Sequence, residues 1–203
     1  MKIAIAGASG QAGSRLTAEL ARRGHAVTAI ARNPEKIATL PGVTAVKGDV
    51  NDQGALTALW AGHDAAISSV HFTVSDPVKL IGAAKASGVG RYLVVGGAGS
   101  LEVAPGVRLV TTPNFPAQYK AEASKGAEFL DLLRQERDLN WTFLSPSALF
   151  VAGERTGKFR LGTDQLLADA NGKSWISFAD YAIALADEIE RPAYLRQRFT
   201  VGY

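Results

Sequence analysis

Three glycines near the start of the chain have a spacing that suits the binding of phosphate. An apolar run at residues 2–6 leads into the segment Gly7-Ala8-Ser9-Gly10-Gln11-Ala12-Gly13, which is followed by a helical pattern. In such a turn the first glycine permits a sharp bend, the second lets the backbone approach phosphates, and the third lets the helix pack closely on the strand. The helix N-terminus then presents free amides and a positive dipole end to an anion. The pattern G-x-x-G-x-x-G therefore predicts that these seven residues hold the diphosphate of a dinucleotide, with a ligand-free tight turn as the alternative.

The second apolar run ends in an arginine where a carboxylate is the more familiar residue. Arg32 stands about 20 residues past the glycines, the position at which NAD-preferring sites carry an acid that binds the ribose 2′-hydroxyl. An acid there would repel a 2′-phosphate, whereas a guanidinium binds one with two parallel hydrogen bonds. Lys36, one helical turn later, adds a second positive charge. We therefore expect NADP(H) to be preferred over NAD(H), the alternative being that Arg32 is a solvated loop residue.

Further contacts to the dinucleotide are expected where the other apolar runs end. Ligands of open α/β sheets bind in the crevice at the carboxyl ends of the strands. The residues at those ends are Asp49 and Val50 for the adenine, Ser68, Ser69 and Val70 for the ribose, Gly97 after the fifth run, and Pro146 and Ser147 beside the nicotinamide. Each of these also has an ordinary interpretation as the exit from a strand.

Apolar runs alternate with helical patterns along the whole chain, which predicts an α/β, Rossmann-like, doubly wound and mostly parallel sheet with flanking helices. The expected strands lie at 2–6, 27–30, 43–46, 64–70, 91–95, 141–144 and 199–201. The expected helices lie at 14–23, 34–40, 53–61, 77–87, around Phe129 and at 180–189. Residues 101–117 show no period and are expected to form a long loop. The pattern predicts one domain over 1–203, with a small substrate-side region around 151–174 and a hairpin turn at 169–172.

Composition excludes several other classes of protein. The 203 residues are 47% hydrophobic, enough for a sizeable core. Lys and Arg outnumber Asp and Glu only 22 to 19 and form no basic block, so we expect no nucleic-acid partner. There is no cysteine and the three histidines are dispersed, so we expect no metal site. No signal peptide is evident and no apolar run approaches the roughly 18 residues of a membrane span, so we expect a cytoplasmic protein.

Several motifs together resemble one family. They are GASGQAG at 7–13, ARNPEK at 31–36, GDV at 48–50, VVGGAGS at 94–100, WTFLSPSALF at 141–150, GERTGKFRLGTDQLL at 153–167 and ISFADYAIAL at 176–185. Over essentially its whole length the chain resembles the atypical short-chain dehydrogenase/reductase group, and within it the NADH–flavin reductase branch. Relatives include NADPH-dependent flavin and biliverdin reductases and redox-sensing NADP binders of the NmrA-like type. The resemblance implies the fold and the cofactor more firmly than the activity.

Two residues are candidates for catalysis on this resemblance. Typical short-chain dehydrogenases reduce carbonyls with a serine and a Tyr-x-x-x-Lys pair, in which the lysine lowers the pKa of the tyrosine. Ser100 corresponds in position to the serine and Tyr119 to the tyrosine, but the residue four positions on is Ala123. Lys120 and Lys125 lie about 100° and 120° away around a helix. Tyr119 is therefore either a weak proton donor or a loop-anchoring aromatic residue.

The missing lysine favours one reaction over another. Carbonyl reduction and epimerisation need the Tyr–Lys couple, whereas hydride transfer to a flavin or quinone leaves a delocalised anion that takes its proton from water. We therefore expect an NADPH-dependent reductase of a planar acceptor. The alternative is a non-catalytic sensor of the NADP redox state, and monomer and homodimer both stay open. Phe72, Phe115 and Phe150 could line an acceptor site, and His71 could donate to it, although each also suits a structural role.

Overall fold

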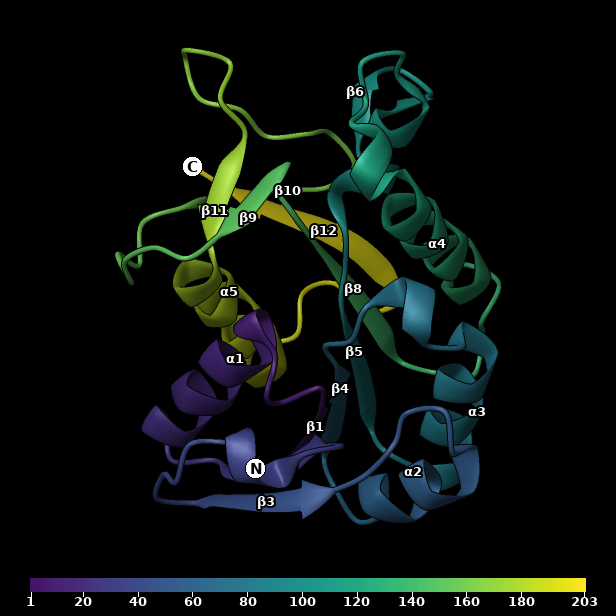
Figure 1. The fold of residues 1–203 in the computed structure, drawn as a ribbon, viewed down its shortest axis with the longest axis vertical. Helices are drawn as coiled ribbons and strands as arrows, with labels where there is room; N and C mark the ends of the chain where they lie inside the picture. The colour runs from purple at the N-terminus through teal and green to yellow at the C-terminus, as the bar shows by residue number, and fades with distance from the viewer.

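The computed structural model describes residues 1–203 and is built on an eight-stranded sheet, shown in Figure 1. The strands are β1 (Lys2–Ala6), β2 (Ala26–Ala31), β3 (Val43–Lys47), β4 (Ala65–Ser68), β5 (Arg91–Val95), β6 (Glu102–Ala104), β7 (Val107–Arg108), β8 (Trp141–Pro146), β9 (Leu149–Val151), β10 (Arg160–Gly162), β11 (Trp175–Ser177) and β12 (Gln197–Gly202). The helices are α1 (Gln11–Arg22), α2 (Gln53–Trp60), α3 (Pro77–Ser87), α4 (Ala117–Leu133) and α5 (Phe178–Glu190). The strand order is β10-β12-β8-β5-β4-β1-β2-β3. All neighbours are parallel except β10 and β12, so the predicted mostly parallel α/β sheet is confirmed.

Helices cover both faces of this sheet. α1 and α5 pack on one face in a cluster of 23 buried apolar residues, and α2, α3 and α4 pack on the other in a cluster of 20. Figure 1 shows the two groups on opposite sides of the strands. In β1, Ile3 and Ile5 enter the first cluster, whereas Ala4 and Ala6 enter the second. A strand buried on both faces explains why the opening run is apolar at every position after Lys2.

Local chemistry accounts for the helix boundaries that the sequence predicts well. The Asp76 carboxylate accepts the Val78 amide at 2.9 Å, and Pro77 occupies the first position of α3. Gly88 ends that helix in the left-handed conformation. The Ser177 hydroxyl caps α5 by accepting the Asp180 amide at 3.0 Å. None of the five helices combines the length and apolar character that a membrane crossing requires.

Four expected elements differ in the structure. α1 begins at Gln11, not at Ser14, because Gly10 is its N-cap. The helix expected at 34–40 is only a 3-10 turn at Pro34–Lys36, since buried Ile37 already has extended backbone. The expected loop at 101–117 contains the β6–β7 hairpin. The turn at 169–172 forms, but no hairpin follows it, because β11 pairs in parallel with β9.

Two small pieces of sheet lie at one end of the molecule, beyond the central strands. β9 and β11 form a pair above α1 and α5, and β6 lies above α4, at the top of Figure 1. Both groups follow the carboxyl ends of parallel strands, since β9 comes after β8 and β6 comes after β5. This end of the sheet is where the glycine-rich turn between β1 and α1 also lies.

Candidate functional site

The turn after β1 is so tightly packed that two of its glycines have no room for a side chain. Gly7 has φ +85°, and a Cβ there would lie 2.0 Å from the Ser69 carbonyl oxygen. A Cβ on Gly13 would lie 2.2 Å from the Gly7 carbonyl oxygen. The Ile30 carbonyl in β2 accepts the amides of Gly7 and Ala8, at 2.9 and 3.1 Å. The backbone of β1, β2, β4 and α1 therefore meets at one point, which is the close packing that the first and third glycines of such a turn permit.

The N-terminus of α1 is left without a cap from the protein itself. Its N-cap is Gly10, which has no side chain to accept a hydrogen bond, and the first turn contains no acidic residue. The first intrahelical bond runs from the Ser14 amide to the Gly10 carbonyl, at 2.8 Å. The amides of Gln11, Ala12 and Gly13 consequently have no backbone acceptor. Three free donors and the positive end of the helix dipole make this terminus suited to an anion.

A pocket of about 390 Å³ lies at this helix terminus. It is lined by Ser9, Gly10, Gln11, Ser14, Arg15, Ala152 and Phe178. The sequence predicts the first three, whereas Ser14, Arg15, Ala152 and Phe178 are new. Arg15 could have been found as the cation two residues after the last glycine. Ala152 and Phe178 come from segments far along the chain, and no local pattern connects them with the turn.

The predicted phosphate-binding arginine lies beside the same turn. Arg32 is exposed directly after β2, two residues beyond the Ile30 carbonyl that holds the glycine turn. Its guanidinium takes part in none of the hydrogen bonds or ion pairs of the structure, although several other arginines do. Lys36 is also exposed nearby on the 3-10 turn. The end of β2 thus presents positive charge with no internal partner.

Several of the other predicted contacts lie at the surface or at its edge. Asp49 is exposed and accepts the Asn51 amide at 2.9 Å, and Val50 is half-buried. Ser69 and Val70 are half-buried directly after β4, and the Ser69 amide bonds the Ala6 carbonyl at 2.8 Å. Gly97 is half-buried after β5, and Pro146 is buried as the last residue of β8. These residues lie at the carboxyl ends of β3, β4, β5 and β8. Because these strands are parallel to β1, the residues lie at the same end of the sheet as the glycine turn.

Two predicted hydroxyls point into the protein instead. Ser68 is 1% exposed and its hydroxyl bonds that of Tyr92 at 2.8 Å, on the face of the sheet under α3 and α4. Ser147 is fully buried and donates to the Val201 carbonyl at 3.0 Å. Both hydroxyls are thus taken up by the protein, and only the backbone of Ser68 and Ser147 is left for the predicted contacts to the ribose and the nicotinamide. A position at a strand end did not determine the direction of the side chain.

Ser100, the first catalytic candidate, belongs to a buried polar cluster. It is 4% exposed, and its hydroxyl accepts the Arg198 guanidinium at 3.4 Å. Arg198 also donates to Ser145 at 3.4 Å and pairs with the Asp164 carboxylate. Burial lowers the pKa of Arg198, and the hydrogen bond that Arg198 donates to Asp164 opposes that shift. The hydroxyl of Ser100 therefore joins the turn after β5 to β12, and Arg198 extends this cluster to the loop after β10.

Tyr119, the second candidate, lacks the partner that the reaction on carbonyls needs. It is 62% exposed in the first turn of α4. Ala123, four residues on, packs against Gly99, where an added Cβ would lie 2.8 Å from the Ala123 Cβ. Lys125 pairs with Glu128 at 2.7 Å instead. The absence of a Tyr–Lys couple at this helix is therefore a property of the structure as well as of the sequence.

Of the three aromatic candidates, one is a core residue and one packs against the lining of the pocket. Phe72 is buried between Phe129 and Phe143, with ring centroids 6.0 and 6.4 Å away, so it is a core residue. Phe150 is half-buried and packs on Phe178, which lines the pocket, at 4.5 Å between centroids. Phe115 is half-buried in the segment before α4.

His71 is a solvent-facing residue after β4. It is exposed and lies 3.2 Å from Glu122 of α4. The Glu122 carboxylate also accepts the amides of Phe72 and Thr73, at 2.7 and 2.9 Å. Burial raises the pKa of Glu122, but its hydrogen bonds from Thr73 and Phe72 outweigh burial and lower it. Glu122 therefore holds the loop after β4 against α4, and His71 is part of this structural contact.

Known proteins share both the sequence and the fold. The chain is 44% identical to the uncharacterized protein YwnB of Bacillus subtilis (strain 168) over 209 residues, spanning 99% of this chain and 98% of YwnB. A "putative epimerase" structure from Bacteroides thetaiotaomicron has a TM-score of 0.95 at 40% identity, covering 100% of this chain and 96% of the other. A "putative NADH-flavin reductase" structure from Streptococcus pneumoniae has a TM-score of 0.83 at 37% identity, covering 100% and 99%.

The family follows from the match of the chain as a whole. Residues 7–192 match the model of a family described as NAD(P)H-binding, and this range starts at the first glycine of the turn. This match, together with the Streptococcus pneumoniae relative whose name includes NADH-flavin reductase, confirms the resemblance drawn from the sequence motifs. With the glycine turn and the uncapped helix at the edge of a parallel sheet, the chain belongs to the NAD(P)H-binding family.

Proposed function

We propose that this protein is an NADPH-dependent reductase that transfers hydride to a planar acceptor such as a flavin or a quinone. The observation that carries the proposal is the junction of β1, β2 and α1. There three backbone amides have no acceptor in the protein, those of Gln11, Ala12 and Gly13. The exposed guanidinium of Arg32 nearby pairs with no acidic side chain. Such donors suit two anionic groups, a diphosphate and a separate phosphate.

The residues present fit a phosphorylated dinucleotide. The free amides would hold the diphosphate, and Gly7, packed against the exit of β4, would keep the turn that presents them tight. Arg32 would bind the 2′-phosphate with its planar fork of donors. Pro146 at the end of β8 would pack near the nicotinamide end. When bound, the reduced nicotinamide supplies a hydride, and the protein supplies binding, orientation and exclusion of competing reactions.

The choice of acceptor rests on what surrounds Tyr119. Ala123 occupies the lysine position, so no side chain four residues on stabilises a tyrosinate. Reduction of a carbonyl or an epimerisation would need that proton donor. A flavin or quinone receives the hydride with both electrons, and the resulting delocalised anion takes a proton from water. The name of the Streptococcus pneumoniae relative, which includes NADH-flavin reductase, supports the same class of acceptor.

Whether water or the Tyr119 hydroxyl supplies the proton can be tested directly by substitution of Tyr119. The loss of NADPH absorbance at 340 nm is followed after addition of FMN, FAD or a simple quinone. We expect Tyr119→Phe to keep kcat within about twofold of the wild type, because general acid catalysis, worth about 100-fold or more where it operates, is not used here. A 100-fold loss of kcat with unchanged NADPH affinity would show that the hydroxyl is the proton donor and would contradict the proposal.

A further inference from the structure

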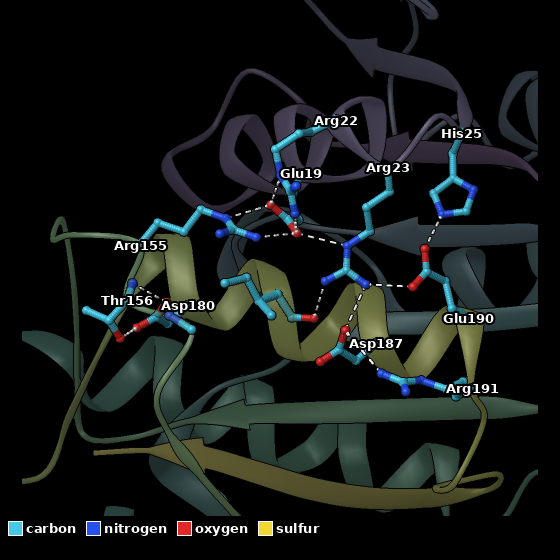
Figure 2. A network of polar contacts seen from close by, with 12 residues as sticks. Glu19, Arg22, Arg23, His25, Arg155, Thr156, Asp180, Asp187, Glu190 and Arg191 are labelled. Carbon is cyan, nitrogen blue, oxygen red and sulfur yellow. Dashed lines mark hydrogen bonds and ion pairs between the residues drawn. The ribbon is translucent and has the colours of Figure 1, made fainter.

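The segment 152–158, between β9 and β10, reaches the pocket at the α1 terminus through its first residue, Ala152. Ala152 lines that pocket opposite Ser9, Gly10 and Gln11. The whole segment is exposed to solvent and contains no strand or helix. Figure 2 shows it beside α1 and α5, with Arg155 and Thr156 reaching toward these two helices. Its position must therefore be determined by side-chain contacts and not by a backbone ladder.

The first of these contacts is made to α1, the helix whose N-terminus faces the pocket. The Glu19 carboxylate is 5% exposed, and Arg155 binds both of its oxygens, at 2.9 and 3.0 Å. Arg22 binds the same two oxygens at 3.1 and 2.7 Å, and Arg23 binds one at 2.8 Å (Figure 2). Burial raises the pKa of Glu19, but the hydrogen bonds from Arg22, Arg155 and Arg23 outweigh it and lower the pKa to about 2. Glu19 is thus an anion at any pH near neutrality.

The second contact is made to α5. The Asp180 carboxylate is fully buried, and one of its oxygens accepts the amides of Thr156 and Gly157, both at 2.8 Å. The other oxygen accepts the hydroxyl of Thr156 and that of Tyr203. Phe178, two residues before Asp180, lines the pocket. Residues 155–157 are therefore held at once to α1 and to α5.

We propose that the segment 152–158 is a strap that positions the outer wall of the diphosphate pocket, and that Arg155 is its positioning residue. The proposal rests on the proposed function, because it assigns the pocket at α1 to the diphosphate of the cofactor. A bidentate arginine–carboxylate pair fixes both distance and orientation. The pair between Arg155 and Glu19 joins the helix that carries the free amides to the strap that faces them. Arg155 itself does not line the pocket, so it acts through the position of Ala152.

The chain offers a closely matched control for this role. Arg22 makes the same bidentate contact to the same carboxylate and carries the same charge. It lies three residues from Glu19 in α1, so its contact stays within one helix and holds no part of the strap. Removal of either arginine leaves Glu19 with two cationic partners. A difference between the two variants therefore reports the connection across the pocket and not the loss of a charge.

The experiment measures dissociation constants of NADPH and of adenosine 2′-monophosphate, which lacks the diphosphate. We expect Arg155→Ala to raise the Kd of NADPH about tenfold, because a displaced wall weakens several contacts without removing any one of them. Arg22→Ala is expected to change it less than about twofold, as a half-exposed ion pair contributes little. Both variants are expected to bind adenosine 2′-monophosphate as the wild type does. Arg155→Lys, which keeps the charge and loses the planar fork, is expected to fall between wild type and Arg155→Ala.

The comparison of these variants decides whether Arg155 positions the strap. Equal effects of Arg155→Ala and Arg22→Ala, or an equal loss of NADPH and of adenosine 2′-monophosphate in Arg155→Ala, would overturn the strap while leaving the proposed function intact. A wild-type protein that binds neither NADPH nor NADH would overturn both. Should Arg155→Ala unfold at a much lower temperature than the wild type, Arg155→Lys against Arg22→Lys gives the same comparison with every charge retained.

Discussion

Replacing Arg32 by alanine is expected to raise the Kd of NADPH about 30- to 100-fold and to leave that of NADH within about twofold. The guanidinium has no internal partner, so its removal leaves no carboxylate unpaired and disturbs no network in the protein. A charge-assisted, bidentate contact with a phosphate is worth about 2 to 2.7 kcal/mol, which corresponds to this change in affinity. NADH carries a hydroxyl at the same place and does not make the contact.

The control for Arg32 is an arginine at the other end of the sheet. Arg137 is exposed in the segment between α4 and β8, before the amino end of that strand. Arg137→Ala removes the same charge and should weaken NADPH and NADH binding equally and only slightly. A parallel loss of NADPH and NADH affinity in Arg32→Ala would show that Arg32 does not bind the 2′-phosphate. Titration by fluorescence or calorimetry measures the Kd of NADPH and of NADH for the wild type and for both variants.

Gly7→Ala is expected to abolish measurable NADPH binding and to lower the free energy of unfolding by about 3 to 4 kcal/mol. Its φ of +85° disfavours any L-residue, and the added Cβ would lie 2.0 Å from the Ser69 carbonyl oxygen and 2.9 Å from a Val70 methyl. Both neighbours belong to the exit of β4, and the Ser69 carbonyl is backbone, so it cannot yield without moving the end of the strand. The turn must therefore open, and the amides that follow it leave their positions.

A substitution at Gly24 measures the cost of the positive φ alone, without the steric clash found at Gly7. Gly24 has φ +81°, close to that of Gly7, but no atom lies within 4 Å of its added Cβ. Gly24→Ala should cost only about 1 kcal/mol from backbone strain and should leave NADPH binding unchanged. Chemical denaturation measures the free energies. If Gly7→Ala cost no more than Gly24→Ala, the close packing of β1 against β4 would not be what holds the turn.

The sequence predicts the fold and the glycine turn because both depend on local patterns. The apolar run of β1, the capped start of α3 and the glycine spacing each contain their own signal within a few residues. The short helix expected at 34–40 fails for a tertiary reason, since Ile37 leaves the turn to enter the core beside α1. Burial of one side chain there outweighs the helical tendency of its neighbours.

The remaining parts of the site depend on contacts that no local pattern contains. Ser68 and Ser147 stand at the predicted strand ends, yet their hydroxyls bond Tyr92 and the Val201 carbonyl, which are far away in the sequence. The wall formed by Ala152 depends in the same way on Glu19, 136 residues from Arg155. Spacing along the chain indicates which residues reach an edge of the sheet, but the direction of each side chain is decided by the partner it meets.

The most direct measurement is the rate of NADPH oxidation, followed at 340 nm, when FMN, FAD or a simple quinone is added to the purified protein. The proposed reductase activity predicts loss of NADPH that requires both protein and acceptor, saturates with NADPH and is much weaker in Arg32→Ala. Tight binding of NADPH with no oxidation by any of these acceptors would contradict it. Such a protein would be a redox sensor, and unequal affinities for NADPH and NADP⁺ would then be its output.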